Sequence, residues 1–136
     1  MTPTPSLPTP ARQGIIRLAM LAGVLLFGAV IAWLSRGGRV PVSARPTSAE
    51  TLAFLRLLAP TIAVTAVVAA TFLRYVLSRT PDPARGWPLR VVAWAVGEGA
   101  ALLGGAYWLL SGDSSRYVIG LVALLATFVV VPLRAR

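Results

Sequence analysis

The sequence contains no cysteine, no histidine and no lysine, and these absences exclude several kinds of chemistry. Without cysteine the chain has no disulfide, no thiolate nucleophile and no thiolate metal ligand. Without histidine it lacks the side chain that most often shuttles protons and binds zinc or haem. It also carries no phosphate-cradling glycine loop, no paired carboxylates and no nucleophile beside a base. We therefore expect no enzymatic activity, no metal and no cofactor.

The composition is dominated by apolar residues and by arginine. Of the 136 residues, 57% are hydrophobic and 12% are charged, whereas about a quarter of the residues in soluble proteins are charged. All 13 basic residues are arginine, and none lies in the middle of an apolar run. Arginine at loops and helix ends orients helices in a bilayer, which accounts for the net charge of +9 without a nucleic-acid partner. We expect an all-α integral membrane protein.

Four apolar segments predict a bundle of four transmembrane helices. We expect residues 13–136 to form this domain, after a disordered, proline-rich cytoplasmic tail at residues 1–12. The spans lie at about 14–34, 58–78, 89–110 and 116–132. The first span is longer than a typical signal-peptide core and no Ala-x-Ala-like site closes it, so we expect it to be retained.

The second span has an N-terminal extension and an internal proline. The residues Thr47-Ser-Ala-Glu50 fit a capping box, in which a hydroxyl and a carboxylate satisfy two free backbone amides. The helical pattern then continues to Ser78, which is longer than the bilayer requires. Pro60 removes one backbone hydrogen bond, so we expect it to break the helix. We expect Ser48 to Ala59 to form an extension that lies along the interface or projects outward from it.

Turn-forming residues mark the next two connections. Ser78 to Pro88 holds three prolines, and we expect a structureless loop there. A shorter turn at Ser111 to Ser115 joins the last two helices, where Ser114 or Ser115 is expected to cap the final helix.

Arginine is distributed unequally between the two ends of the predicted bundle. The end that carries both chain termini has eight: Arg12, Arg17, Arg74, Arg79, Arg85, Arg90, Arg134 and Arg136. The other end has five: Arg36, Arg39, Arg45, Arg56 and Arg116. Because cytoplasmic loops are richer in arginine, we expect a multi-pass protein of the cytoplasmic (inner) cell membrane with both termini in the cytoplasm. Arg79, Arg85 and Arg90 can also contact lipid headgroups or an acidic partner.

One carboxylate, Glu98, lies inside the third predicted span. It stands eight residues, or about 12 Å of helix, from the boundary residue Arg90. A charged acid at that depth costs about 2.5–3.5 kcal/mol, so the side chain should face protein or a water-filled cavity and stay neutral. Gly97, Ala101 and Gly105 repeat beside it at a spacing that lets another helix approach closely. We expect Glu98 to face this helix seam.

Threonines are the hydroxyl partners that lie deep enough for Glu98. Thr127 is the preferred hydrogen-bond partner, and Thr71 is the second choice. Arg17 and Arg74 have side chains long enough to reach toward Glu98 from the cytoplasmic rim.

Three functions stay open at this point. In the favoured one, the third helix packs through Glu98 and the Gly97, Ala101, Gly105 row against another copy or a larger membrane complex, as a structural or accessory protein. In the second, Glu98 carries a proton or an ion, although no histidine, lysine or second acid lies within a span to relay it. In the third, a lipid or a small hydrophobic molecule binds between the helices.

The string Glu98-Gly-Ala-Ala-Leu-Leu-Gly-Gly is followed by an apolar run. It resembles the carboxylate-bearing helix of the proteolipid c subunits of ATP synthase, in which an acid precedes an Ala-Leu-x-Gly pattern. It also resembles a helix of small bacterial four-helix membrane proteins with a Glu-x-x-Ala-Leu-x-Gly pattern. The likeness covers about residues 94–110, one helix of four. The c-subunit resemblance implies that Glu98 is a proton or sodium site, and both resemblances imply close helix packing.

Overall fold

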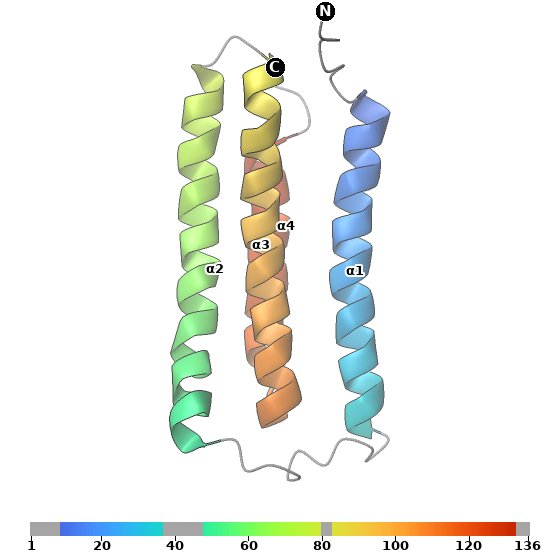
Figure 1. The fold of residues 1–136 in the computed structure, drawn as a ribbon, viewed down its shortest axis with the longest axis vertical. Helices are drawn as coiled ribbons and strands as arrows, with labels where there is room; N and C mark the ends of the chain where they lie inside the picture. Colours follow the sequence, from blue (N-terminus) through green and yellow to red (C-terminus); the bar gives the residue numbers. More distant parts are fainter. Residues whose placement is uncertain (1–8, 37–47, 80–82, 133–136) are drawn as a thin grey trace, which may run out of the picture.

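The computed structural model of the chain describes residues 9–36, 48–79 and 83–132, and in these ranges it is all-helical. The helices are α1 (Pro10–Arg36), α2 (Ala49–Ser78), α3 (Pro83–Ser111) and α4 (Ser115–Val130). They run alternately in opposite directions, so the start of α1 and the end of α4 lie at the same end of the molecule (Figure 1). The predicted all-α architecture with four helices is confirmed. Most of the expected tail, residues 1–8, lies outside the described residues, and α1 already begins at Pro10 rather than near Gln13.

Three of the helices contain stretches long and apolar enough to cross a membrane, namely Ala11–Arg36, Ala49–Ser78 and Gly86–Ser111. The fourth, α4, is apolar as well, but its 16 residues give a length of about 24 Å, short of a hydrocarbon core of about 30 Å. It ends at Val130 because a proline disfavours the helical conformation of the residue before it, and Val131 precedes Pro132 with φ −109° and ψ 83°. By length alone, α4 does not qualify as the expected fourth span.

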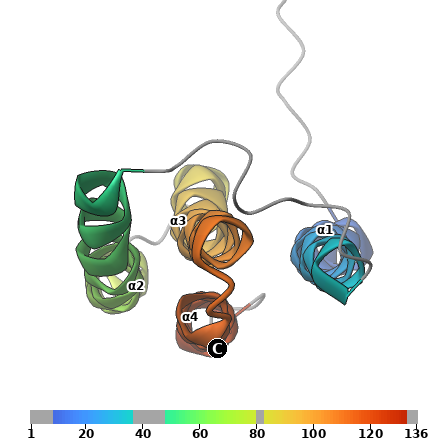
Figure 2. The same ribbon diagram turned by 90° about the horizontal axis from the view of Figure 1, so that it is seen from below.

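The helices α2, α3 and α4 form a three-helix core, and α1 lies against one side of it. Seen along the bundle, α3 and α4 are adjacent, α2 flanks them on one side and α1 stands on the other (Figure 2). Helix α3 contacts all three other helices. Helix α1 contacts α3 and α4 but, over the described ranges, not α2. The bundle is therefore asymmetric, with α3 at its centre.

Glycines bring α3 and α4 close together. A Cβ atom on Gly97 would lie 2.7 Å from Thr127 Oγ1, and a Cβ on Gly120 would lie 2.5 Å from a backbone carbonyl oxygen of α3. A Cβ on Gly104 would overlap the backbone of Arg116. Real Cβ atoms do not approach other atoms this closely, so glycine is required for this separation of the two helices.

Alanine has the same role on α2. Its buried residues recur every three or four positions on one helix face, and they are Ala59, Ala63, Ala66 and Ala70. This stripe meets small residues of the other two core helices, such as Ala100 and Ala123. The core is therefore held by close backbone approach and van der Waals packing, as in helix bundles within lipid.

Helix α1 meets the core along residues spaced alternately four and three positions apart. They are Arg17, Leu21, Val24, Gly28 and Ile31. The hydroxyl of Tyr117, on α4, donates to the carbonyl oxygen of Val24 at 2.7 Å. The Tyr117 ring occupies the space that a side chain at Gly28 would need. One tyrosine therefore ties α1 to the start of α4.

The sequence interpretation of residues 78–88 as a structureless loop was wrong, because α3 already begins at Pro83. A proline suits the first helical position, where its missing N–H has no partner to lose. Pro88 lies one turn further on and removes one backbone hydrogen bond. Packing compensates for this loss, since Gly86 is buried against Leu77 of α2 and the Trp87 ring meets the edge of Trp94 at 5.8 Å between centroids.

The expected break at Pro60 is also absent. Helix α2 runs without interruption from Ala49 to Ser78 with Pro60 inside it, and its first turns lie displaced from the rest when seen along the bundle (Figure 2). The N-cap is Ser48, whose Oγ accepts from the Thr51 amide at 3.1 Å, and not Thr47, which lies outside the described residues. The cap therefore begins one residue later than the predicted capping box.

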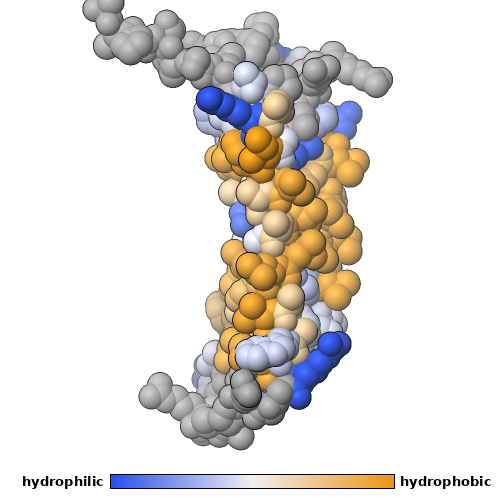
Figure 3. Space-filling model, turned by 90° about the vertical axis from the view of Figure 1, so that its right-hand side faces the viewer, coloured by the Kyte–Doolittle hydropathy of each residue, from blue (hydrophilic) through white to orange (hydrophobic). Residues whose placement is uncertain are grey.

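The exterior is apolar between two polar ends. From the α1 side, a hydrophobic band separates hydrophilic residues at both ends of the molecule (Figure 3). Large exposed apolar side chains occur on every helix, for example Leu26 on α1, Val68 on α2, Val92 on α3 and Val129 on α4. Soluble monomers rarely expose apolar patches of this extent, whereas lipid-facing helices do.

A carboxylate organises the turn between α3 and α4. Asp113 accepts from the backbone N–H and from the hydroxyl of Ser115, both at 2.9 Å. Ser114, at the N-cap position, makes no side-chain cap bond, so Asp113 takes the role that was expected of a serine. The hydrogen bonds from Ser115 hold the pKa of Asp113 below its ordinary value, and the positive charges of Arg116 and Arg56 act in the same direction.

We predict that Gly104→Ala lowers the free energy of unfolding by about 1–3 kcal/mol, because the new methyl group meets backbone atoms that cannot rotate away. Gly99→Ala is the matched control, since nothing lies within 4 Å of its Cβ position. It should leave stability unchanged or raise it by up to about 1 kcal/mol through helix propensity. Unfolding in mixed micelles followed by circular dichroism measures both. Equal stability of the two variants would show that the α3–α4 distance is not set by glycine.

We predict that Asp113→Asn removes one of the contributions to stability that the wild type loses as the pH falls. Because the folded pKa of Asp113 is lowered, its contribution is complete above the unfolded pKa and is lost as the pH falls through the folded pKa. The melting temperature of the wild type should therefore fall more steeply between pH 5 and about pH 3 than that of the variant. Thermal melts at matched ionic strength test this. Parallel curves for the two proteins would contradict it.

Candidate functional site

The C-terminal end of α4 receives side-chain donors from the three other helices. Arg17 Nη2, from α1, donates to the carbonyl oxygen of Phe128 at 3.0 Å and to that of Val131. Trp94 Nε1, from α3, donates to the Val131 carbonyl oxygen at 3.2 Å. These two side chains therefore converge on the same helix end.

Arg74 completes this group from α2, with Nη1 at 3.3 Å from the carbonyl oxygen of Val130. The last carbonyl groups of a helix have no partner within the helix and carry the negative end of its dipole. Guanidinium and indole donors satisfy them and match that charge. We name Arg17, Arg74 and Trp94 the α4 cap cluster.

Arg17 lies in an aromatic setting. Its Cζ stands 4.3 Å from the ring centroid of Trp94 and 5.2 Å from that of Phe128, which is within range for cation–π attraction. Trp94 is fully buried, and its ring meets Phe128 edge-on at 6.1 Å. Arg90 of α3 repels Arg17 electrostatically. The carbonyl groups and the rings oppose this repulsion and hold the guanidinium in place.

Glu98 is half-buried on the face of α3 that turns toward α1. It follows Trp94 by four residues and precedes Gly105 by seven, so the three share one face of the helix. Arg17 of α1 covers the Trp94 ring, and Phe27 of α1 lies against Gly105. No described residue donates a hydrogen bond to the Glu98 carboxylate, and its oxygens are not sealed inside the bundle.

Neither of the expected hydroxyl partners bonds to Glu98. Thr127 is fully buried, but it donates to the carbonyl oxygen of Leu124 at 2.7 Å. Thr71 is exposed and donates to the carbonyl oxygen of Val67 at 2.8 Å. A helical threonine commonly donates its hydroxyl to the preceding turn in this way. The Thr127 oxygen could still accept a hydrogen bond, but Thr127 lies against Gly97 on the α4 side of α3, whereas Glu98 turns toward α1.

The small-residue row divides between two neighbouring helices. Gly97 and Ala101 lie against α4, whereas Gly105 faces α1. Gly104, rather than Gly105, completes the contact with α4. All four residues are buried, so the row packs within the chain.

The arginines around the α2–α3 connection lie at the same end as the α4 cap cluster. The Arg79 guanidinium stands 4.4 Å from the ring centroid of Tyr75, and Arg90 is half-buried on α3. The side chain of Arg85 lies outside the described part of the chain. Together with Arg12, Arg17 and Arg74, these residues give this end a strongly positive character.

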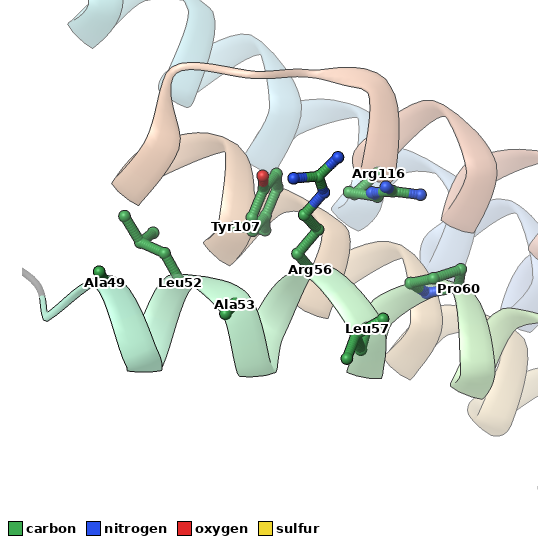
Figure 4. A pocket seen from close by; sticks show the side chains of 8 residues that line it. All are labelled: Ala49, Leu52, Ala53, Arg56, Leu57, Pro60, Tyr107 and Arg116. Carbon is green, nitrogen blue, oxygen red and sulfur yellow. The ribbon is translucent and has the colours of Figure 1, made fainter.

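A pocket of 760 Å³ lies at the opposite end, between the first turns of α2 and the adjoining ends of α3 and α4 (Figure 4). Its apolar wall belongs to α2 and consists of Ala49, Leu52, Ala53, Leu57 and Pro60. Its polar groups are Arg56 of α2, Tyr107 of α3 and Arg116 of α4. We call these eight residues the basic groove.

The described residues contain no group of three or more side chains of the kinds that hold a metal ion. Comparison with known protein families, curated proteins and solved structures found no match to this chain. The sites must therefore be interpreted from their own chemistry.

Sequence reasoning did not find the α4 cap cluster or the basic groove. The signal for the first was an arginine seven residues inside α1 together with a proline that ends α4, because the ended helix needs donors for its carbonyl groups. Arg17 was instead assigned to the membrane boundary. The groove had no such signal, because it depends on how α2 leans relative to α3 and α4.

We predict that Arg17→Met destabilises the fold by about 1.5–3 kcal/mol, since it leaves the partly buried Phe128 carbonyl group of α4 without its charged donor. The tryptophan emission should also change, because the guanidinium leaves the face of Trp94. Arg12→Met is the matched control, because Arg12 is exposed on the same end of α1. Unfolding in mixed micelles and fluorescence spectra give the two readouts. If both variants behave alike, the α4 cap cluster does not hold α1.

Proposed function

We propose that the protein is a small multi-pass membrane protein of structural or accessory type. In this proposal it associates through Glu98 with a polar group on a transmembrane helix of another copy or of a larger membrane complex. It has no enzymatic activity of its own and needs no metal or cofactor. It resides in the cell membrane with both termini in the cytoplasm.

The observation that carries this proposal is that the Glu98 carboxylate has no hydrogen-bond partner among the described residues. Glu98 stands twelve residues from the start of the candidate span Gly86–Ser111, close to its middle. An acid at that depth costs about 2.5–3.5 kcal/mol unless it finds protein, water or a proton. A polar group on a partner helix would lower this cost, since hydrogen bonds between helices in lipid contribute about 0.6–2 kcal/mol. Because the small-residue row packs against α4 and α1 of the same chain, it is not open to a partner helix. A partner would instead contact α3 along its edge beside α1, where Glu98 lies.

The distribution of charge supports the orientation. Among described residues, the end with the start of α1 carries Arg12, Arg17, Arg74, Arg79 and Arg90. The other end carries Arg36, Arg56 and Arg116, together with the acids Glu50 and Asp113. Arginine is enriched on the cytoplasmic side of membrane proteins, so the first end is assigned to the cytoplasm.

A proton or ion carrier that uses Glu98 is the second candidate, and the same free carboxylate favours it. A carrier normally has a chain of polar groups that leads to both surfaces. The other described acids, Glu50 and Asp113, lie at the start of α2 and in the α3–α4 turn. With no second acid near the middle of a described span, the structural role comes first.

The test compares Glu98→Gln, Glu98→Leu and the wild type in mild detergent and in nanodiscs. Glutamine keeps the size and the hydrogen-bonding capacity of the side chain, whereas leucine removes the polar group. We expect the wild type and Glu98→Gln to form the same assembly in native mass spectra. The Glu98→Leu assembly should dissociate at a protein concentration at least about tenfold higher than the wild-type assembly does. Glu50→Gln, on an exposed acid in the first turn of α2, is the control and should associate like the wild type.

Proton flux into liposomes separates the two candidates. We expect none for any of the four proteins. A flux in the wild type that Glu98→Gln abolishes while assembly persists would replace the structural role with a carrier role. A wild type that is monomeric, or an assembly that survives Glu98→Leu, contradicts association through Glu98.

A further inference from the structure

The basic groove combines a charged rim with an apolar wall. The side chains of Arg56 and Arg116 extend over the same side of α2, and the hydroxyl of Tyr107 points to the same region (Figure 4). The wall runs along α2 from Ala49 to Pro60. The three polar residues come from three different helices, so the groove exists only in the folded bundle.

The polar groups of the groove have unused hydrogen-bonding capacity. Arg116 Nε is buried without a hydrogen-bond partner in the described part of the chain. Arg56 is exposed, and neither guanidinium is within ion-pair distance of a described carboxylate. Asp113 feels the charge of both arginines, but its own oxygens are occupied by Ser115. Two guanidinium groups and one carboxylate leave a net positive site.

The chain itself offers nothing anionic to fill this site from the adjacent linker. Residues 37–47 connect α1 to α2, and their sequence includes Arg39 and Arg45 but no acid. The nearest acid on α2, Glu50, does not line the groove. The charge of the groove therefore calls for an anion from outside the chain.

The chemistry of the groove matches one kind of anion. Guanidinium groups bind phosphate oxygens in paired hydrogen bonds, and a tyrosine hydroxyl adds a further donor. A free phosphate ion would not use the wall of Leu52 and Leu57, whereas an acyl chain would. The groove lies at the level where the candidate spans of α2 and α3 have their ends, which is where lipid headgroups reside.

We propose that the basic groove binds an anionic phospholipid, with the phosphate between Arg56 and Arg116 and one acyl chain along α2. This inference rests on the membrane location in the proposed function but not on the role of Glu98. A failure of one therefore leaves the other standing, since their variants lie on different faces and have different readouts.

The experiment measures lipid retained by the purified protein. Delipidated wild type is titrated with phosphatidylglycerol and, separately, with phosphatidylcholine of the same chain length, and bound lipid is counted by native mass spectrometry. Arg56→Gln and Arg116→Gln should each weaken phosphatidylglycerol binding by about fivefold, and the double variant should weaken it more than either single variant. Arg36→Gln, an exposed arginine at the same end that does not line the groove, should bind like the wild type.

Two further arms identify what is bound and guard against misfolding. Glycerol 3-phosphate, which has the phosphate but no acyl chain, should not compete at equal concentration. Arg116→Lys keeps the positive charge at a half-buried position, and Arg56→Gln changes only an exposed side chain. If Arg116→Gln does not fold, lipid binding by these two variants tests the proposal in its place. Equal binding of the two lipids, unchanged binding in Arg56→Gln, or full competition by glycerol 3-phosphate would overturn the proposal.

Discussion

The separation between α3 and α4 is the constraint on which the rest of the structure depends. It is set where Gly97, Gly104 and Gly120 leave no room for a side chain. Because α3 and α4 are this close, the alanine stripe of α2 can reach both of them at once. The same close approach brings Tyr117 to the position where it bonds to α1. In lipid, where burial of apolar surface drives little association, such geometric fit supplies most of the attraction between helices.

Polar contacts then fix the outer helix at two levels. Near the start of α1, the Arg17 side chain donates to the last carbonyl groups of α4, and at the middle of α1 the Val24 carbonyl group accepts from Tyr117. Each contact joins α1 to α4 through a backbone group, so it does not depend on a particular partner side chain at that position. Helix α1 is thereby aligned with the core although it has only one side in contact with it.

The four helices could be predicted from the sequence, but the contacts between their side chains could not. Apolar runs bounded by glycine, proline and arginine predicted the four helices, and small-residue spacing predicted a close seam on α3. The same spacing could not tell Gly104 from Gly105, because neighbouring residues on a helix differ by about 100° in direction and the position of α4 was unknown. Pro60 and Pro88 were interpreted as breaks because tertiary packing, which compensates for a lost backbone bond, is not visible in a local pattern. The expected bonds of Glu98 failed because the direction of each side chain depends on how the helices pack. Glu98 turns toward α1, whereas Thr127 lies against Gly97 and Thr71 is exposed on α2.

The shortness of α4 has a mechanical consequence for a surrounding bilayer. Helix α4 is about 24 Å long, whereas the other helices have 27 to 30 residues. The α4 side of the bundle would therefore present a shorter hydrophobic length to lipid than the other sides. Such hydrophobic mismatch is relieved by local thinning of the membrane, at a cost of a fraction of a kcal/mol per Å. The thinning would be confined to the α4 side of the molecule and would draw the interface toward the Asp113 turn. In the proposed membrane location, such an asymmetric bundle would impose an uneven thickness on the lipid around it, and this would favour neighbours that share the same deformation.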